Sequence, residues 1–406
     1  MKLLTFLGAG NYKQVEYIWG DQRYRTDLFP SAVVEWLRPQ ETVVFLTKEA
    51  RELHWERFRS MVGDKTKLIA RDIPAGQSEE ELWQIFDIVV ESVQQREEIV
   101  VDITHAFRSL PMLLLSIVMF LRATREVCVK HIFYGQYLEG KDEAPVLDLI
   151  LFLQLLDWAS ATQRFKETGD ARWIGKTLCQ THRQLWKDQA ARPQHLHTAG
   201  SSLQQLSQAL QLARPIEAAQ TAQGLLETIT NAAQEIAAWA KPFSLLLEEV
   251  QQQAGQLAYE QAEVLDESYL RKQVHFIRSL HACGMVMQSA LMAREWIVNW
   301  AIWRRAGGAS LQKEEWLSPE VRSLAEEEMN CAFSPRRQAI VQLAWLNHPQ
   351  EGEILRNLWP ALCDLRNDLA HCGMRTNPLA AEKLREHVEE YLNRLPMLLQ
   401  LAISTV

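Results

Sequence analysis

The chain has 406 residues, of which 47% are hydrophobic and 23% are charged, a balance typical of globular proteins. This length indicates two or three domains and a core large enough to fold without disulfides or a structural metal. The formal net charge of -8 argues against a large, non-specific nucleic-acid surface, which requires a basic excess. It leaves room for a small pocket that binds a few phosphates.

The six cysteines show neither CxxC pairs nor the Cys/His spacing of zinc sites, so we expect reduced thiols and no bound metal. The apolar N-terminal segment is too short for a signal peptide. The longest apolar run, from Pro111 to Leu121, is too short to span a bilayer. We therefore expect a cytoplasmic protein with no membrane partner.

In the first 150 residues, short apolar runs alternate with amphipathic stretches. Five runs have the composition of buried parallel strands: Leu3–Leu7, Thr42–Leu46, Lys67–Ala70, Ile99–Val101 and Val129–Tyr134. The stretches between them predict four helices: Ser31–Leu37, Lys48–Val62, Glu79–Gln95 and Phe107–Thr124. Thr47 and Ser78 are the expected N-caps of the second and third helices. This alternation predicts an α/β domain whose mostly parallel sheet carries helices on both faces.

From about residue 152 the strand signals end, and Leu, Ala, Gln and Glu recur at helical spacing. We predict three segments: the α/β domain at 1–152, a helical linker or insertion at 153–270, and an all-α domain at 271–406. The middle segment contains no motif that indicates a function. A loop is expected over Arg192–Gly200.

In an open α/β sheet, ligands bind beyond the carboxyl ends of the strands. The first strand is followed by flexible, amide and phenol groups: Gly8, Gly10, Asn11 and Tyr12. The glycines allow close approach to a phosphate or base, and the other two offer hydrogen bonding and stacking. Thr47 and Lys48 follow the second strand and suit an anion at a helix N-terminus. Taken alone, a tight turn and a capped helix also explain these groups.

The end of the fourth strand is the densest in polar groups. Five candidate ligand-binding residues lie where strand becomes helix: Asp102, Thr104, His105, Arg108 and Ser109. We expect Lys48, His105 and Arg108 to face an anionic ligand as cations, with the glycines, Asn11 and Thr104 lining the pocket.

The segments Leu7–Tyr12 and Asp102–Pro111 together resemble the CARF domains of CRISPR-associated proteins, in the group with an Asp-x-Thr-His-Gly signature. This chain has Ala106 where that group has glycine, which puts a methyl group where the ligand approaches. The resemblance covers roughly residues 1–150 and implies a Rossmann-like fold that binds a cyclic oligoadenylate. It also implies a homodimer or higher even oligomer with one ring across its two-fold axis. Cyclic tetra-adenylate is the preferred activator, and no other cofactor is implied.

A second motif lies near the C-terminus, on a helix predicted by leucines at spacings of three and four: Leu358, Leu362, Leu365 and Leu369. Gly373 is expected to end this helix. Asn367 and His371 lie one turn apart, whereas Arg366 and His371 are about 140° apart but both flank the polar side. Histidine exchanges protons near neutral pH, and arginine binds phosphoryl oxygens with a planar fork.

The segment Arg366-Asn367-Asp368-Leu369-Ala370-His371 resembles the Arg-x4-His motif of HEPN ribonucleases. Taken alone, a surface arginine and a capping histidine explain it more simply. A CARF-like domain followed by an all-α domain is, however, the architecture of CARF–HEPN ribonucleases of type III CRISPR systems. Met285–Ala301, which contains Arg294 and Glu295, resembles an earlier HEPN helix, and this pair is either a support of the site or a buried ion pair.

The resemblance implies a metal-independent endoribonuclease of antiviral defence that cuts single-stranded RNA and leaves a 2′,3′-cyclic phosphate. In that reaction Arg366 binds the scissile phosphate, His371 exchanges the proton and Asn367 orients one of them. Two other functions stay open. One is a binding-only cyclic oligoadenylate sensor. The other is a ring nuclease that degrades its activator through CARF residues such as Thr104 or His105.

Overall fold

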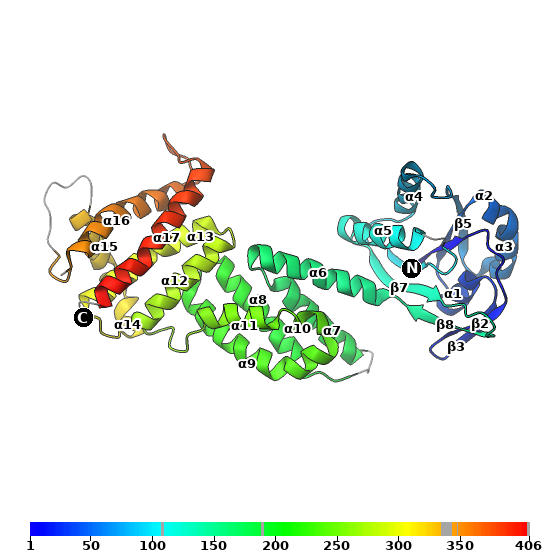
Figure 1. The fold of residues 1–406 in the computed structure, drawn as a ribbon, viewed down its shortest axis with the longest axis horizontal. Coiled ribbons are helices and arrows are strands. Elements are labelled where there is room, and N and C mark those ends of the chain that lie inside the picture. The colour runs from blue at the N-terminus through cyan, green and yellow to red at the C-terminus, as the bar shows by residue number, and fades with distance from the viewer. Residues whose placement is uncertain (107–108, 188–190, 334–342, 347, 404–406) are drawn as a thin grey trace. The chain divides into compact units, whose positions relative to one another are not determined.

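The computed structural model describes residues 1–106, 109–187, 191–333, 343–346 and 348–403 (Figure 1). It divides into two compact units, Met1–Leu156 and Asp157–Val406, and the division falls within helix α6 (Ile150–Thr168). The first unit is α/β and the described part of the second is helical, so the predicted order of fold classes is confirmed. Among the described residues, no helix has the length and apolar character that a membrane span requires.

The described residues of the first unit form one eight-stranded sheet in the order β3-β2-β8-β7-β6-β1-β4-β5. Its strands are β1 (Lys2–Leu7), β2 (Val15–Trp19), β3 (Gln22–Thr26), β4 (Glu41–Leu46), β5 (Lys67–Asp72), β6 (Glu98–Asp102), β7 (Cys128–Gly135) and β8 (Glu143–Asp148). Strands β7, β6, β1, β4 and β5 run parallel, so their carboxyl ends share one edge of the sheet. These are the five strands that the sequence predicts.

The hairpin of β2 and β3 is absent from the sequence prediction. Val15 and Tyr17 are buried, and the turn that follows Trp19 contains Gly20 with a φ of 57°. Alternating burial and a glycine turn are the ordinary signals of a hairpin. The charged outer residues and the five-residue length of each strand made these signals weak.

Helices cover both faces of the sheet, as predicted. They are α1 (Phe29–Leu37), α2 (Lys48–Ala50), the π-helical turn η1 (Arg51–Trp55), α3 (Glu56–Val62), the 3-10 turn η2 (Gly63–Lys65), α4 (Glu79–Glu91) and α5 (Leu110–Arg125). Alternate residues of β1 enter two separate cores, with Leu3 packed beside α1 and α3 and Leu4 beside α4 and α5. The predicted N-caps are confirmed, because Thr47 accepts from the Ala50 N–H and Ser78 from the Glu81 N–H.

The second unit has one continuous apolar core that reaches from Trp158 to Ala402. Beyond α6, its helices are α7 (Arg172–Lys187), α8 (Leu196–Gln211), α9 (Pro215–Trp239), α10 (Lys241–Ser244), α11 (Leu247–Leu257), α12 (Glu267–Ala282), α13 (Val286–Arg305), α14 (Lys313–Trp316), α15 (Pro319–Phe333), α16 (Pro349–Ala370) and α17 (Ala381–Ile403). The predicted division at residue 270 lies inside this unit and stays a prediction.

The loop predicted over Arg192–Gly200 is wrong in its second half, where α8 begins at Leu196. The carboxylate of Glu235 accepts hydrogen bonds from the N–H groups of Gln194, His195 and Leu196, at 2.7, 2.9 and 2.9 Å. An acid from α9 therefore satisfies the free amides at the start of α8, a role usually filled by a local side chain.

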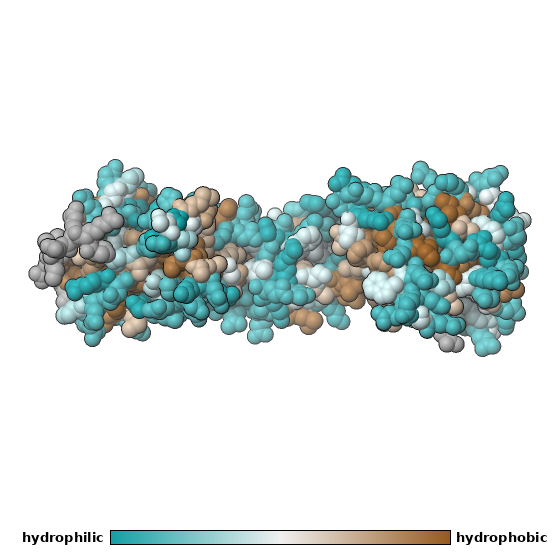
Figure 2. All heavy atoms as spheres, turned by 90° about the horizontal axis from the view of Figure 1, so that it is seen from above, coloured by the Kyte–Doolittle hydropathy of each residue, from teal (hydrophilic) through white to brown (hydrophobic). Residues whose placement is uncertain are grey.

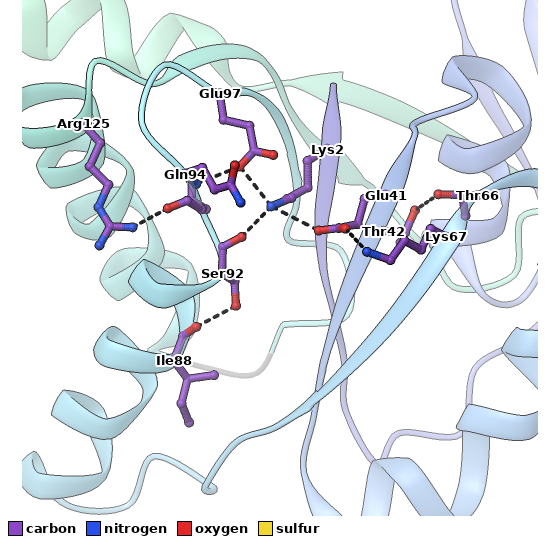
Figure 3. A network of polar contacts seen from close by, with 11 residues as sticks. Lys2, Glu41, Thr42, Thr66, Lys67, Ile88, Ser92, Gln94, Glu97 and Arg125 are labelled. Carbon is purple, nitrogen blue, oxygen red and sulfur yellow. Dashed lines mark hydrogen bonds and ion pairs between the residues drawn. The ribbon is translucent and has the colours of Figure 1, made fainter.

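A buried lysine fixes the amino ends of three neighbouring strands (Figure 3). The Nζ of Lys2 lies 3.1 Å from Glu41 Oε1 and 3.0 Å from Glu97 Oε2, and it donates to the Ser92 carbonyl at 2.7 Å. Lys2 begins β1, Glu41 begins β4, and Glu97 directly precedes β6. Because Lys2 is only 6% exposed, its charge depends on these partners.

We expect Lys2→Met to lower the free energy of unfolding by about 2–3 kcal/mol, because it leaves two partly buried carboxylates without their cation. The matched control is Lys67→Met, which removes an ammonium that also pairs with Glu41 but is 71% exposed. Its expected cost is below about 1 kcal/mol. Urea denaturation followed by far-ultraviolet circular dichroism measures both, and equal shifts for the two variants would contradict the assignment.

Candidate functional site

The carboxylate of Asp102 joins the ends of three strands at the carboxyl edge of the sheet. Thr5 on β1 donates its hydroxyl to Asp102 Oδ2 at 2.6 Å, and the N–H of Thr104 donates to Oδ1 at 2.9 Å. The Thr104 hydroxyl in turn accepts from the N–H of Gly135, the last residue of β7, at 2.8 Å. The segment that leaves β6 is thereby held between its two neighbours.

Asp102 is fully buried. Burial raises the pKa of its carboxyl to about 6, although the hydrogen bonds from Thr5 and Thr104 act in the opposite direction. Its side chain is therefore enclosed by protein groups, and its predicted role in ligand binding stays a prediction. Asp102 holds the residues around it in place.

The loop after β1 folds back on itself through Tyr12. The Tyr12 hydroxyl donates to the Gly8 carbonyl at 2.9 Å and accepts from the Gly8 N–H at 3.0 Å. A Cβ on Gly8 would lie 3.2 Å from both the Tyr12 hydroxyl and the His105 carbonyl, which explains the need for glycine. Both residues were predicted to contact a ligand, but their polar groups here bond to each other.

His105 is buried, and its ring lies 3.9 Å from that of Tyr12, measured between centroids. Its Nε2 accepts a hydrogen bond from the N–H of Phe29 at 3.1 Å, so a neutral ring carries its proton on Nδ1. Burial lowers the pKa of His105 to about 3, and nearby His54 adds to the shift. The structure thus places His105 inside the domain, and its predicted role in facing the ligand stays a prediction. His105 is a neutral group that fixes the start of α1.

Four of the predicted ligand residues are exposed at this edge: Gly10 and Asn11 after β1, Lys48 after β4, and Ser109 before α5. Thr104 is half-buried, and Thr47 is buried as a helix cap. Arg108 lies outside the described residues. The exposed set offers an amide, an ammonium and a hydroxyl along the carboxyl edge of the sheet.

Ala106 fits this site without strain. The described non-glycine residues with a positive φ are Arg38, Arg96, Glu126, Ala213 and Cys372. Ala106 is not among them, and its N–H donates to the Ile103 carbonyl at 3.1 Å. The departure from the Asp-x-Thr-His-Gly signature thus places only a methyl group at this edge.

Two residues of this edge were missed by sequence reasoning. His54, on the π-helical turn η1, contacts the Gly10 carbonyl through Nε2 at 2.9 Å. Gly135 must be glycine, because a Cβ there would lie 2.6 Å from the ring of Tyr17. A glycine at a strand end is a signal that could have found Gly135, whereas His54 sits within a predicted helix and has none.

The first unit also exposes apolar side chains on the side of α4 and α5, which Figure 2 views from above. Trp83 is 59% exposed on α4, and Met112 is 78% exposed on α5. A hollow of about 170 Å³ lies beside them, lined by aliphatic and aromatic groups that include Ile103, Met112 and Phe152. Exposed apolar patches of this kind mark interaction surfaces.

In the second unit, α16 ends at the predicted place. The N–H of Gly373 donates to the Asp368 carbonyl at 2.9 Å, and that of Cys372 to the Leu369 carbonyl at 3.1 Å. These two bonds form a Schellman motif, with Cys372 in the left-handed conformation that glycine usually takes there. The closure leaves His371 at the helix end, where its side chain is exposed.

Arg366, Asn367 and His371 are all exposed. The Arg366 Nη1 donates to Asn367 Oδ1 at 3.1 Å, and the His371 N–H donates to the Asn367 carbonyl at 3.0 Å. Asn367 therefore contacts both other residues of the predicted motif, through its side chain and its backbone. Arg375, missed by sequence reasoning, lies beside the motif and donates to Asp364 at 2.9 Å.

The predicted helix around Met285–Ala301 is confirmed as α13. Its Arg294 donates to Glu326 of α15 at 2.9 and 2.6 Å and to Glu295 at 2.7 Å, so it is the most buried member of a partly exposed ionic network. The hydrogen bond from Arg294 lowers the pKa of Glu326 against the effect of burial, and the charge of Arg366 contributes. Arg366 on α16 is therefore near enough to Glu326 for its charge to act on this carboxylate.

Within the described ranges, no group of three or more His, Cys, Asp or Glu side chains has an arrangement that could hold a metal ion. The exposed residues that the sequence predicts for the two regions include an amide, an ammonium, a guanidinium and an imidazole. Such groups bind anions and transfer protons.

The comparisons with known proteins agree with the geometry of the first unit. Residues 2–137 match the family model of the CARF domain of the CRISPR system endoribonuclease Csx1. Residues 154–258 match that of the second domain of the CRISPR-associated protein MJ1674. The first unit therefore has the CARF domain of CRISPR-associated proteins, and the predicted CARF resemblance is confirmed.

One relative by sequence is the CRISPR-associated protein MJ1674 of Methanocaldococcus jannaschii, which is 31% identical over 121 residues. The aligned segment is 29% of this chain and 18% of that protein, so the similarity covers a small part of the relative. The second family match places residues 154–258, to which the sequence assigned no function, in a domain shared with a CRISPR-associated protein. The HEPN resemblance of the C-terminal segment stays a prediction.

The pKa of Asp102 leads to a test of its burial. Its folded-state pKa of about 6 exceeds the ordinary 3.8, so the folded chain binds this proton more tightly than the unfolded chain. The contribution of Asp102 to the free energy of unfolding therefore falls as pH rises from about 4 to about 6. We expect a loss on the order of 2 kcal/mol in the wild type and a flatter profile in Asp102→Asn.

Urea midpoints measured from pH 4 to pH 7 give this profile. Asp142→Asn is the control, since that side chain is 88% exposed and should leave the wild-type slope unchanged. The same pH slope in wild type and Asp102→Asn would show that Asp102 does not titrate in this window.

Proposed function

We propose that the chain is a cyclic oligoadenylate-activated endoribonuclease that acts as a type III CRISPR effector in antiviral defence. The observation that carries this proposal is the exposed cluster of Arg366, Asn367 and His371 at the end of α16, in a chain whose first unit is a CARF domain. An arginine and a histidine beside one helix end supply an anion-binding group and a proton-transfer group. We assign this helical region to the HEPN class.

In the proposed reaction the 2′-hydroxyl of the substrate RNA attacks the adjacent phosphate. His371 exchanges the proton, and Arg366 binds the phosphoryl oxygens as negative charge develops. Asn367 positions Arg366, because its side-chain oxygen accepts from the guanidinium. The products are a 2′,3′-cyclic phosphate and a 5′-hydroxyl, and each step uses only side chains and substrate hydroxyls. One arginine and one histidine are few groups for this reaction. A homodimer would supply two of each.

The cyclic activator is proposed to bind at the carboxyl edge of the sheet. The support for this site is the exposed set of Gly10, Asn11, Lys48 and Ser109 around residues held rigid by Asp102. Arg108 is proposed as a further cation. A cyclic tetra-adenylate is the first choice, because its four-fold symmetry contains the two-fold axis of a dimer. Hexa-adenylate also contains that axis, so the family resemblance supplies the preference.

The apolar side of α4 and α5 is the surface that we propose for the homodimer, or for the dimers of a higher even oligomer. One ring across the two-fold axis would contact both subunits and favour one mutual arrangement. It would shift the population of active dimers only by its differential affinity for the two arrangements. Activation is then a coupling between the CARF site and the RNA site.

The ring-nuclease alternative loses one of its two candidate groups. His105 is buried and neutral, and its Nε2 is engaged by Phe29, so it is a poor acid or base for ring cleavage. The binding-only alternative differs from our proposal in a single respect. It requires neither Arg366 nor His371 for any activity.

His371→Ala should reduce RNA cleavage by on the order of 10²-fold or more, which is typical for loss of an acid–base group. Binding of cyclic tetra-adenylate should persist. The assay uses labelled single-stranded RNA with each cyclic oligoadenylate in turn and with EDTA present. His387→Ala on α17 is the matched control. Undiminished cleavage by His371→Ala, or products that end in a 3′-hydroxyl, would contradict the mechanism.

Lys48→Ala should weaken the binding of cyclic tetra-adenylate about tenfold or more, since it removes a charge-assisted contact to a phosphate. Lys130→Ala is the control, because Lys130 lies on β7 near its amino end and pairs with Glu98. Isothermal titration calorimetry measures both affinities. The site assignment fails if the two variants bind the ring equally well.

A further inference from the structure

The segment around α7 and α8 has a positive net charge, whereas the net charge of the whole chain is negative. Residues 171–216 contain one acid, Asp188, against six basic residues: Arg172, Lys176, Arg183, Lys187, Arg192 and Arg214. This is a net charge of +5 in a chain of net charge -8, so the remaining residues carry -13. The net charge of the whole protein argues against an extensive basic surface, but it conceals this local one.

The cations of α7 lie on one face of the helix. Six of its exposed residues recur at the spacing of a single stripe: Trp173, Lys176, Gln180, Arg183, Gln184 and Lys187. Arg172, which pairs with Asp170, and Trp186 are exposed beside it. The opposite side buries Ile174 and Leu178. There Gly175 packs so closely on α8 that a Cβ would lie 2.3 Å from the Gly200 carbonyl. The stripe is therefore presented by a firmly packed helix.

The cations of this stripe are not neutralised. Within the described part of the chain, Lys176, Arg183 and Lys187 form no ion pair with an acid. Elsewhere in the same unit, exposed cations do so, as Arg271 with Glu267 at 2.7 Å and Arg394 with Glu390. Cations that have no acidic partner among the described residues create a positive potential that favours an anionic partner.

The stripe also holds an exposed aromatic ring. Trp173 is 46% exposed, with the Lys176 Nζ 4.7 Å and the Arg164 guanidinium carbon 5.3 Å from its ring centroid. The cations hold the indole at the surface through cation–π contacts. An indole between cations can stack on a nucleobase while the cations contact the neighbouring phosphates. A nucleic acid offers a flat ring to the indole and phosphates to the cations in one ligand, whereas a lipid headgroup offers the phosphate without a ring.

We propose that this face of α7, the α7 stripe, binds single-stranded RNA. The indole of Trp173 stacks on a base, and Lys176, Arg183 and Lys187 contact successive phosphates. The stripe is distinct from the Arg366–His371 cluster and gives the substrate a second contact that requires no particular sequence. This inference rests on the proposed function only in taking RNA as the substrate.

Fluorescence anisotropy of the full-length His371→Ala protein with a labelled 20-nucleotide RNA tests the stripe, from 50 to 200 mM salt. The double variant Lys176→Gln/Arg183→Gln should bind at least about tenfold more weakly at the lower salt, and its salt slope should fall by about 1.4. Trp173→Ala should weaken binding about fivefold or more without changing the slope. If the variants only disturbed the packing of α7, the salt slope would not change in the charge variant alone.

The control is the double variant Lys241→Gln/Arg278→Gln, which removes two exposed cations from the same unit. Its affinity and salt slope should match those of the parent protein. The proposal is overturned if the Lys176/Arg183 variant and the control bind RNA equally. It is also overturned if phosphatidylglycerol vesicles bind through Lys176 and Arg183 while RNA does not. Ring-stimulated cleavage in the wild type is scored separately, so failure of the stripe and failure of the nuclease are distinguishable.

Discussion

The carboxyl edge of the sheet depends on the hydrogen bonds of one buried carboxylate, that of Asp102. One oxygen accepts from Thr5 on β1 and the other from the Thr104 N–H, and Thr104 passes the connection to Gly135 on β7. A carboxylate removed from water is costly unless its oxygens are satisfied, so these groups are fixed relative to one another. The residues that stay exposed around them are thereby presented in a set arrangement before any ligand arrives.

Strand β1 is anchored by charge at both ends. Lys2 joins its amino end to Glu41 and Glu97, and Thr5 joins its carboxyl half to Asp102. Both charged groups lie inside the sheet domain, where the pairings would be disrupted by a one-residue shift of register. The carboxyl edge is therefore supported by the sheet as a whole. In the loop after β1, two hydrogen bonds between Tyr12 and Gly8 add local support.

The helical unit presents its polar groups by a different means. The Schellman closure after α16 ends the helix at the point that leaves His371 exposed and one turn from Asn367. The ionic network of Arg294 with Glu295 and Glu326 is partly buried, and its arginine packs on Trp359 of this helix. On α7, by contrast, the close approach of Gly175 and Gly200 turns one face inward and leaves the basic face outward. In both cases backbone packing decides which side chains meet solvent.

Local pattern determined much of this protein. The five parallel strands, the caps Thr47 and Ser78, and the end of α16 shortly before Gly373 follow from hydrophobic period and from residues next to each boundary. Only the tertiary structure decided which polar residues at the carboxyl edge of the sheet are exposed. The sequence predicts Asp102 and His105 as ligand-binding groups because it cannot show their hydrogen bonds within the protein. In the structure Thr5 donates to Asp102 and the N–H of Phe29 donates to His105. The start of α8 depends likewise on Glu235, and such partners lie tens of residues away, beyond the reach of any local pattern.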